Sequence, residues 1–553
     1  MAEPLLKKRA APFFLSLADA QKKTIRLCCT FVVIPLIYSK QEIGAGPAET
    51  ALRTVKPIHG RIKEVFHTRR ILIFFSAVLL TLFLAVTQAL ACTTIIVGRG
   101  ASADGSRIFG RTVDAPSSMG VIGTQLRTVP AAAGSGTWIF HDENNGLEAE
   151  LPAAGCQYVC TMFMPSRHMG VWAENAENEY GVCISATESL FANKAALDAD
   201  PLVPNGVAES NISVLVIPYV KTAREGVERL ARMVERYGSA EGNGVVFADD
   251  TETWYMEIYT GHQWAAQKVP DDCYAVIANA AILGALDLSD TDNAMACETI
   301  WSLPEEKGFL QKADGKPNLA LTYGDLDDYR TYNVVRLWGG DHLFNPSTAG
   351  EYDINKNYEP FRKPESPITL RQVMEATRYR FEDTEFSSNL PGSTTRPIGI
   401  ERAVQCHLFQ LRDGKPTILW QCFSPSEFSV YMPLYGNLTS VPGAFDVDSL
   451  TADPDSAFWL MRTLSSFGTL DRENYGQTIR ATWRALEDKW IAGIDAMDAE
   501  YTASGRNGDV AAGLFADIAR EAMDEGRNLL NVTLTKFSTN VTKKTGVFGE
   551  DHK

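Results

Sequence analysis

A single cysteine, Cys92, follows a segment that has the pattern of a secretory leader. Residues 71–86 are apolar and come directly after two arginines, and residues 89–91 read Ala-Leu-Ala. A basic flank, an apolar segment and a small-x-small triplet are typical of a signal peptide and its cleavage site. Cleavage after Ala91 would make Cys92 the first residue of the mature chain, so that a thiol and a free α-amino group would sit on one residue.

These two groups together could catalyse covalent acyl transfer. A free cysteine has a pKa of about 8.5, so at neutral pH it is mostly a protonated thiol and needs a base. An α-amino group has a pKa of about 7.7–8.0. It could take that proton, directly or through one water, and later return it to a leaving amine. The expected chemistry is hydrolysis through a thioester on Cys92.

The segments after Cys92 are predicted to form a hairpin that brings charged residues to it. The β-branched run at residues 93–97 predicts a strand, residues 98–106 a turn, and residues 107–113 the returning strand. Counting outward from the turn places Cys92 opposite the Arg111–Asp114 segment. The thiol, a guanidinium and a carboxylate should therefore converge.

Arg111 and Asp114 are the candidate partners of the thiol. Arg111 would favour the thiolate by its charge, and because it stays protonated it cannot serve as the base. Asp114 would accept hydrogen bonds from the amine and orient it. The alternative interpretation is that the two side chains form an ordinary surface salt bridge on the hairpin.

The region before Cys92 leaves alternatives open. Residues 1–91 are interpreted as a leader region, with segment 71–86 as the apolar core of the signal peptide, and residues 1–64 are excluded from the fold analysis. A retained signal anchor would instead tether the protein to a membrane. A lipoprotein signal would also leave an N-terminal cysteine, and the lipid would block the amine chemistry. Such signals usually have Leu three places before the cysteine, where this chain has Ala89.

The charge of the chain excludes some classes of partner. The 553-residue chain carries a formal charge of −16, and since its first 91 residues are net basic, residues 92–553 are strongly acidic. Binding of nucleic acid or of an anionic membrane needs a basic surface, so neither is an expected partner. A membrane contact is expected only through an uncleaved leader.

Cysteine and aspartate spacing gives no strong metal signal. Cys156 and Cys160 could form a local disulfide or remain free buried thiols. No second Cys or His pair at zinc spacing accompanies them. Asp287, Asp290 and Asp292 lack the spacing of an EF-hand and are interpreted as part of a solvated loop.

The order of the predicted elements indicates an α+β fold. After the hairpin come predicted strands at 170–173, 181–186, 212–218, 245–247, 253–259, 264–269, 274–279, 403–411 and 417–423. A turn is predicted at 174–180, an amphipathic helix at 221–237 with Gly238 as its C-cap, and a mainly helical tail from Asn474. Stacked sheets covered by helices are therefore expected.

Several motifs resemble one known family. They span residues 92–293 most clearly and are Cys92-Thr-Thr-Ile-Ile-Val-Gly, Arg111-x-x-Asp114, Asn178-Glu-Tyr-Gly-Val, Trp254-Tyr-Met-Glu-Ile-Tyr-Thr-Gly-His262 and Val269-Pro-Asp-Asp-x-Tyr-Ala-Val-Ile-Ala-Asn279. Together they are similar to the C69 dipeptidases. That family belongs to the N-terminal nucleophile hydrolases and is related to bile salt hydrolases and penicillin V acylases.

The resemblance implies a fold and a set of roles. It implies a four-layer αββα domain over residues 92–553 with a helical C-terminal elaboration at 474–553, and no metal or organic cofactor. It carries the role of nucleophile to Cys92, of assisting groups to Arg111 and Asp114, and of oxyanion donor to Asn279. The remaining implied residues are Asn178 as a substrate contact, Glu188 as a second oxyanion or substrate contact, and either Arg396 or Arg402 as a further arginine of the site.

The function expected from these features is that of a cysteine dipeptidase exported to the periplasm or the extracellular space. Its substrate would be a dipeptide or another small peptide. One alternative is an amidase of the same superfamily that acts on N-acyl amines or β-lactams. Another is a lipidated or anchored binding protein without catalysis. Homo-oligomerisation stays open, and His168, His262 and His407 are interpreted as structural.

Overall fold

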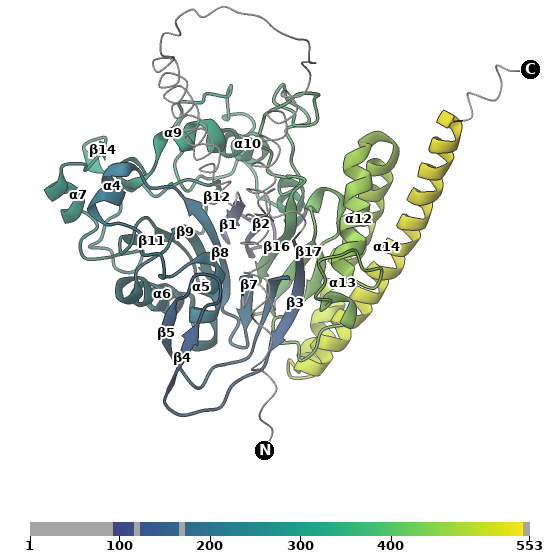
Figure 1. Cartoon of the computed structure of the whole chain (residues 1–553), viewed down its shortest axis with the longest axis horizontal. Helices are drawn as coiled ribbons and strands as arrows, with labels where there is room; N and C mark the ends of the chain where they lie inside the picture. The colour runs from purple at the N-terminus through teal and green to yellow at the C-terminus, as the bar shows by residue number, and fades with distance from the viewer. Residues whose placement is uncertain (1–91, 116–121, 165–171, 546–553) are drawn as a thin grey trace, which may run out of the picture. The chain divides into compact units, whose positions relative to one another are not determined.

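The structure is a computed structural model that describes residues 92–115, 122–164 and 172–545. The predicted leader, His168 and the first half of the strand predicted at 170–173 lie outside the described residues. Figure 1 shows the described part as two sheets with helices on their outer sides.

The first sheet is antiparallel and contains the predicted hairpin. Its six strands, in spatial order, are β12 (Tyr274–Ile277), β1 (Thr93–Val97), β2 (Arg107–Asp114), β16 (Ala403–Leu411), β17 (Ile418–Phe423) and β18 (Met432–Leu434). Thr93 pairs with Thr112, so Cys92 is next to Val113, as the hairpin count predicts. β16 joins the other side of β2, and His407 lies opposite Arg111.

The second sheet has eight antiparallel strands. In spatial order they are β13 (Ala294–Ala296), β11 (Trp264–Lys268), β10 (Thr253–Ile258), β9 (Gly242–Ala248), β8 (Cys183–Leu190), β7 (Ala173–Asn178), β6 (Tyr158–Met164) and β3 (Gly123–Val129). The meander predicted after the amphipathic helix is therefore present as β9, β10 and β11. The strand predicted to follow it, β12, crosses to the first sheet.

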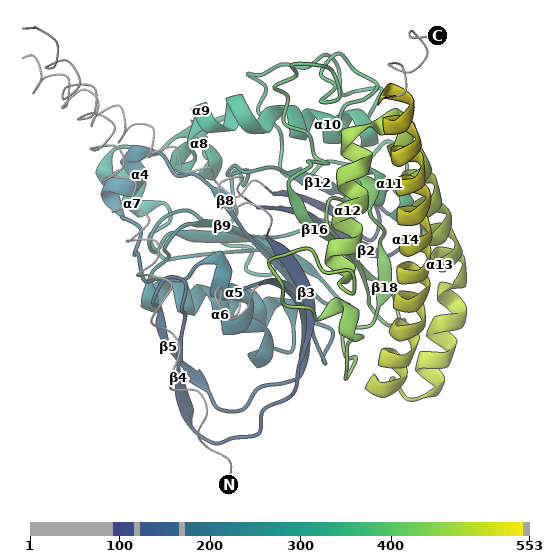
Figure 2. The same cartoon turned by 45° about the vertical axis from the view of Figure 1, so that its right-hand side comes forward.

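The two sheets face each other and are covered by helices on both outer sides. Side chains bridge the sheets, as where Thr161 Oγ1 donates to Gln421 Oε1 at 2.8 Å. Helices α5 (Glu209–Val216) and α6 (Ala223–Tyr237) pack on β7–β10, and α10 (Val334–Phe344) packs on β12. Helices α12 (Ala457–Leu470), α13 (Gln477–Ala503) and α14 (Gly508–Thr545) pack against β17 and β18 (Figure 2). This is the expected α+β fold with four αββα layers and a helical C-terminal part.

Helix α6 forms where its sequence predicts it. Thr222 caps its first turn by accepting a hydrogen bond from Glu225 N, and Gly238 ends it with a φ of +75° that other residues rarely adopt. Its apolar face, which includes Val227, Leu230 and Val234, is buried. Amphipathic spacing therefore identifies both the helix and the face that packs.

Two predicted elements are wrong, for opposite reasons. Residues 212–218 were expected to be a strand but belong to α5 and a following 3₁₀ turn, Ile217–Tyr219. All eight residues of α5 are buried, so the segment lacks the polar face that marks a helix in sequence. Within the turn predicted at 174–180, only residues 179–180 form a turn, and residues 174–178 belong instead to strand β7, whose six residues are all buried. Its glutamates and asparagines read as a turn because their partners lie in distant segments.

Other predictions on sulfur, metals and membranes concern the part of the chain that the structure describes. All eight cysteines there are free thiols, so Cys156 and Cys160 do not form the disulfide that was one of two alternatives. No group of three His, Cys, Asp or Glu side chains among these residues could hold a metal ion. Likewise, no helix within residues 92–545 is long and apolar enough to cross a membrane.

Candidate active site

Cys92 directly precedes β1, in the interior between the two sheets. It is only 2% exposed. Burial raises the pKa of its thiol; Arg111 acts in the opposite direction, while the carboxylates of Asp114 and Glu174 raise it further. The Thr187 side chain offsets part of the increase by hydrogen bonding. Since the net direction is upward, the thiol is protonated at neutral pH and needs a base before it can attack.

Arg111 reaches across to the second sheet and is completely buried. Its guanidinium donates to the carbonyl of Ala186 on β8 and to the Glu174 carboxylate on β7, and its Nη1 lies 3.6 Å from Glu209 Oε1. Burial raises the pKa of both glutamates, although the positive charge of Arg111 favours their ionised forms. Two acids and a carbonyl therefore fix one cation beside the thiol.

Asp114 faces a separate pair of arginines. Arg396 Nη2 donates to its Oδ2, and Arg402 Nε lies 3.9 Å from the same oxygen. Both candidates for the further arginine therefore lie at the site, with Arg396 in closer contact. Burial raises the pKa of Asp114, and three arginines oppose that increase. Arg111 and Asp114 have different partners and neither is exposed, so the surface salt-bridge interpretation is wrong.

Asn279 follows β12 and is held by Arg336, a residue that the sequence analysis missed. Arg336 donates to Cys92 O at 2.7 Å, to Thr93 Oγ1 at 2.9 Å and to Asn279 Oδ1 at 2.9 Å. An arginine can only donate, so Oδ1 must face it and the Asn279 amide nitrogen points the other way. Asn333 completes this group, since Asn279 N donates to its Oδ1 and its Nδ2 donates to Asn279 O.

The sequence did contain a signal for Arg336. It lies in α10 within the run Val334-Val335-Arg336-Leu337-Trp338, which is buried throughout. A single charge in an otherwise apolar helical run predicts a buried ion or hydrogen-bond partner. Its partners come from β1 and from the end of β12, which are far away in sequence, so they could not be identified from the pattern.

The structure does not bring the predicted substrate contact Asn178 to this cluster. Asn178 ends β7, and its Nδ2 donates to the carbonyls of Ile217 and Val220 at 2.9 and 2.8 Å. Its Oδ1 accepts from the backbone N–H groups of Tyr180 and Val182, each at 3.0 Å. Asn178 therefore uses both ends of its amide to hold a turn.

The second predicted contact, Glu188, lies near the cluster but belongs to a group of acids. It pairs with Asn243 across β8 and β9, and its charge adds to the burial that raises the pKa of Glu241 to about 8. Glu241 Oε1 in turn accepts from Glu209 N at 2.6 Å, and Glu209 is the second acid facing Arg111. Glu188 is thus connected to the thiol through other acids and does not act on it directly.

This arrangement provides the parts of an acyl-transfer site. A buried thiol lies between a guanidinium held by two carboxylates and a carboxylate held by two guanidinium groups. An oriented amide lies nearby, and the main chain of Cys92 is fixed by Arg336. Groups fixed in this way need little reorganisation when charge develops during a reaction. Four αββα layers around such a thiol define the protein's class as a hydrolase.

The chain belongs to Peptidase family C69, whose family model matches residues 91–485. It is therefore a peptidase, and the resemblance in its motifs is confirmed.

Individual relatives agree with this assignment. A probable dipeptidase from Latilactobacillus sakei is 33% identical over 388 residues, which is 68% of this chain and 80% of the relative. A probable dipeptidase B from Streptococcus pyogenes serotype M1 is 31% identical over 446 residues, 77% of this chain and 88% of the relative. A solved structure of a mutant conjugated bile acid hydrolase from Clostridium perfringens matches 59% of this chain and 88% of its own at 9% identity. Its TM-score of 0.27 is too low to support any conclusion.

Proposed function

We propose that the protein is an exported cysteine dipeptidase that hydrolyses small peptides through a thioester on Cys92. The observation that carries this proposal is the convergence of Cys92 with the Arg111, Asp114 and Asn279–Arg336 groups in one buried cluster. The names of the similar bacterial proteins, probable dipeptidases, support the choice of substrate.

The first half of the reaction forms the thioester. The α-amine of Cys92, freed by cleavage after Ala91, takes the thiol proton, and the sulfur attacks the carbonyl carbon of the peptide bond. The Asn279 amide donates to the oxyanion of the tetrahedral intermediate. When the intermediate collapses, the C–N bond breaks and the α-ammonium gives its proton to the leaving amine.

The second half regenerates the enzyme. Water gives a proton to the α-amine and attacks the thioester carbonyl, the C–S bond breaks, and the thiolate recovers the proton. The products are a free amino acid from each side of the bond. Asp114 orients the ammonium, while Arg111 favours the thiolate by charge.

The surroundings of the thiol support the α-amine as the base, and the leader pattern supports cleavage after Ala91. The strongest influences on the pKa of the Cys92 thiol are burial and the side chains of Arg111, Asp114, Glu174 and Thr187, none of which is a histidine. His407, which is paired with Arg111 across β2 and β16, contacts Ser185 Oγ at 2.9 Å, and burial lowers its pKa well below the usual value. The leader pattern before Cys92 would supply both export and the free amine.

The proposal is tested by N-terminal sequencing and intact mass of active enzyme from its native host, combined with a substrate panel. We expect Cys92 as an unmodified first residue, hydrolysis of dipeptides, and little activity on N-acyl amines and β-lactams. The rate should rise with pH between about 7 and 8.5 as the amine loses its proton. Any other first residue, or an acylated one, would refute the mechanism.

A further inference from the structure

A second pocket lies away from Cys92. It has a volume of about 280 Å³ and lies where the β7–β8 and β16–β17 turns meet the segment after β18 and the α13–α14 connection. Strand β2 connects the two places. At one end Arg107 donates to the Asp250 carbonyl at this pocket, and near the other end Val113 lies beside Cys92. Six residues at about 3.3 Å each separate the two places by about 20 Å. A dipeptide bound at Cys92 cannot reach this pocket.

The floor of this pocket is the carboxyl group of Glu177. Glu177 is only 5% exposed, and its Oε2 is buried without a hydrogen-bond partner. Burial raises its pKa to about 8, with no compensating charge. A Cβ at position 436 would lie 2.4 Å from that Oε2, so Gly436 is needed to leave room for the carboxyl group. A buried acid without a partner is costly, so a ligand that brings a cation to Glu177 would remove that cost.

One wall of the pocket is aromatic. The rings of Tyr435 and Tyr501 are stacked, with centroids 4.1 Å apart and planes at 13°. Their hydroxyl groups are used elsewhere, because Tyr435 donates to Asp498 Oδ1 and Tyr501 donates to Asn437 Oδ1. The wall therefore offers ring surface to a ligand and few polar groups.

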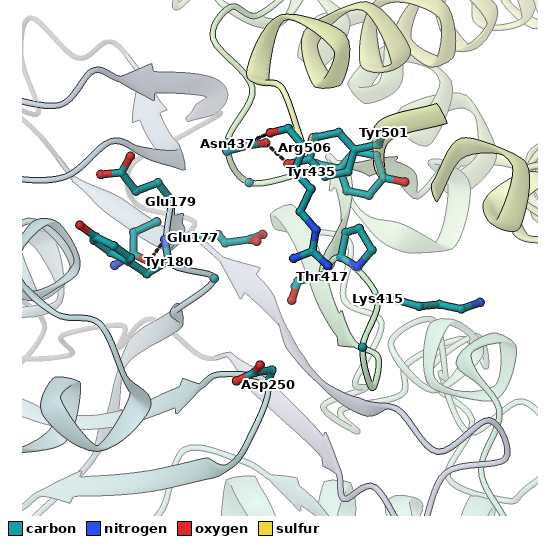
Figure 3. A pocket seen from close by; sticks show the side chains of 15 residues that line it. Glu177, Glu179, Tyr180, Asp250, Lys415, Thr417, Tyr435, Asn437, Tyr501 and Arg506 are labelled. Atoms are coloured by element: carbon teal, nitrogen blue, oxygen red, sulfur yellow. Dashed lines mark hydrogen bonds between the residues drawn. The ribbon is translucent and has the colours of Figure 1, made fainter. Parts of the chain in front are cut away.

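A cation lies on the opposite side from Glu177. Arg506 has a φ of +59°, and its carbonyl accepts from Asn437 Nδ2 at 2.9 Å, which fixes its backbone. Its guanidinium forms no ion pair within the described residues, whereas Lys415 is paired with Asp495 at 2.6 Å. Figure 3 shows Glu177 and Arg506 extending into the same space from different walls, with Asp250 well apart.

We infer that this pocket binds a free α-amino acid as its zwitterion. The ligand's ammonium would pair with the Glu177 carboxylate, which releases its proton to solvent on binding. The ligand's carboxylate would pair with Arg506, and its side chain would pack on the Tyr435–Tyr501 stack. The volume suits such a ligand, since pockets for larger organic molecules run to about 300–1,000 Å³. No metal-binding group of three acids, histidines or cysteines occurs among the described residues, so a metal ion is disfavoured. The pocket's own groups define this ligand, independently of the reaction proposed at Cys92.

Calorimetric titration of the mature enzyme with L-phenylalanine tests the inference. We expect a binding event that weakens at least tenfold in Glu177→Gln, while kcat/KM for a dipeptide stays within twofold. The matched control is Glu179→Gln, which removes an acid at the rim of the same pocket and should leave the titration unchanged. A Glu177→Gln titration that equals the wild type, or no binding of phenylalanine to the wild type, overturns the inference.

Two analogues separate the roles of the charged groups. Phenethylamine, which lacks the carboxylate, and N-acetylphenylalanine, which lacks the ammonium, should each bind at least tenfold more weakly than phenylalanine. Arg506→Ala should weaken phenylalanine and leave phenethylamine unchanged. If phenethylamine binds as tightly as phenylalanine, the zwitterion is the wrong ligand. Because binding is measured directly, these results hold whether or not the enzyme proves to be a dipeptidase.

Discussion

Buried charges are arranged differently at the two ends of the stacked sheets, the Cys92 end and the Glu177 end. At the Cys92 end, opposite charges are grouped, with Arg111 between Glu174 and Glu209, and Asp114 next to two arginines. At the other end, Glu177 has no ion pair, and a glycine keeps the space around its carboxyl group open. Strand β7 supplies an inward-facing acid to both ends, Glu174 at one and Glu177 at the other, so the difference lies in the partners that surround each acid.

The charged groups near Cys92 are held in place by their ion pairs, whereas the Glu177 carboxyl group has no partner in the chain. A paired and hydrogen-bonded charge has one geometry, which suits a reaction that needs fixed dipoles. A single buried carboxyl group is destabilising until a cation or a donor arrives. The Cys92 end therefore fits chemistry, and the Glu177 end fits reversible binding.

Replacing the nucleophile should give the largest effect. Cys92→Ser exchanges a thiol for a hydroxyl that is far harder to deprotonate, so kcat/KM for a dipeptide should fall about a thousandfold or more. The measurement is steady-state hydrolysis, with circular dichroism to establish that the variant is folded. Cys273→Ser is the control, because Cys273 lies at the opposite end of β1 from Cys92, where Gly98 N donates to its carbonyl, and the variant should keep near-normal turnover. A Cys92→Ser enzyme at full activity would refute the assigned nucleophile.

Replacing Arg336 should have the next largest effect, through its hold on Asn279. Lysine at this position has no planar fork, so Arg336→Lys cannot donate to Cys92 O, Thr93 Oγ1 and Asn279 Oδ1 together. We expect kcat to fall about a hundredfold, the range seen when an oxyanion donor is lost, with a smaller change in KM.

The matched control for Arg336 is another buried arginine. Arg378 donates to Glu487 on α13 and to the carbonyl of Ser426 between β17 and β18, and none of these bonds reaches Cys92, Thr93 or Asn279. Arg378→Lys should lower the melting temperature and leave kcat of the folded enzyme near normal. Equal losses of kcat in both variants would mean that Arg336 acts only through stability.

The sequence predicts the Cys92 end better than the Glu177 end. The hairpin register follows from counting along a turn, and the places of Arg111 and Asp114 follow from that register. The place of Arg336 does not, because helix α10 meets β1 only in the tertiary fold. Strand β7 was mistaken for a turn, because the partners that allow its glutamates to be buried come from other strands. The spacing of apolar residues shows which face of a segment is buried. It does not show which distant side chain will neutralise a buried charge.

A stability measurement should distinguish the two kinds of buried acid. Glu177 has a folded-state pKa of about 8, above its usual 4.5, so the unfolded chain releases this proton first as pH rises. The contribution of Glu177 to the free energy of unfolding therefore falls as the pH rises from about 4.5 to 8. Relative to the wild type, Glu177→Gln should gain up to about 1.4 kcal/mol of unfolding free energy per pH unit in that window. Urea unfolding at pH 5, 6.5 and 8 measures this difference.

Replacing Glu174, the buried acid at the Cys92 end, should lower the free energy of unfolding instead of raising it. Glu174→Gln removes an ion-pair partner of the buried Arg111 and should destabilise the protein by about 3 kcal/mol. Glu179→Gln, which changes an exposed side chain, should show neither the pH-dependent gain in stability nor the loss. If Glu177→Gln is no more stable at pH 8 than at pH 5, relative to the wild type, Glu177 has a partner and the contrast between the two ends fails.

The smallest expected effect concerns Asn178, which adjoins the Glu177 pocket. Its amide makes four hydrogen bonds that fasten the β7 turn to the segment after α5. Asn178→Ala should therefore lower the free energy of unfolding by about 1–3 kcal/mol, since two carbonyls and two N–H groups lose their partner. Because none of these bonds reaches Cys92, kcat and KM at 25 °C should stay within twofold. A raised KM with unchanged stability would restore Asn178 as a substrate contact and would place the substrate some 20 Å further along the sandwich.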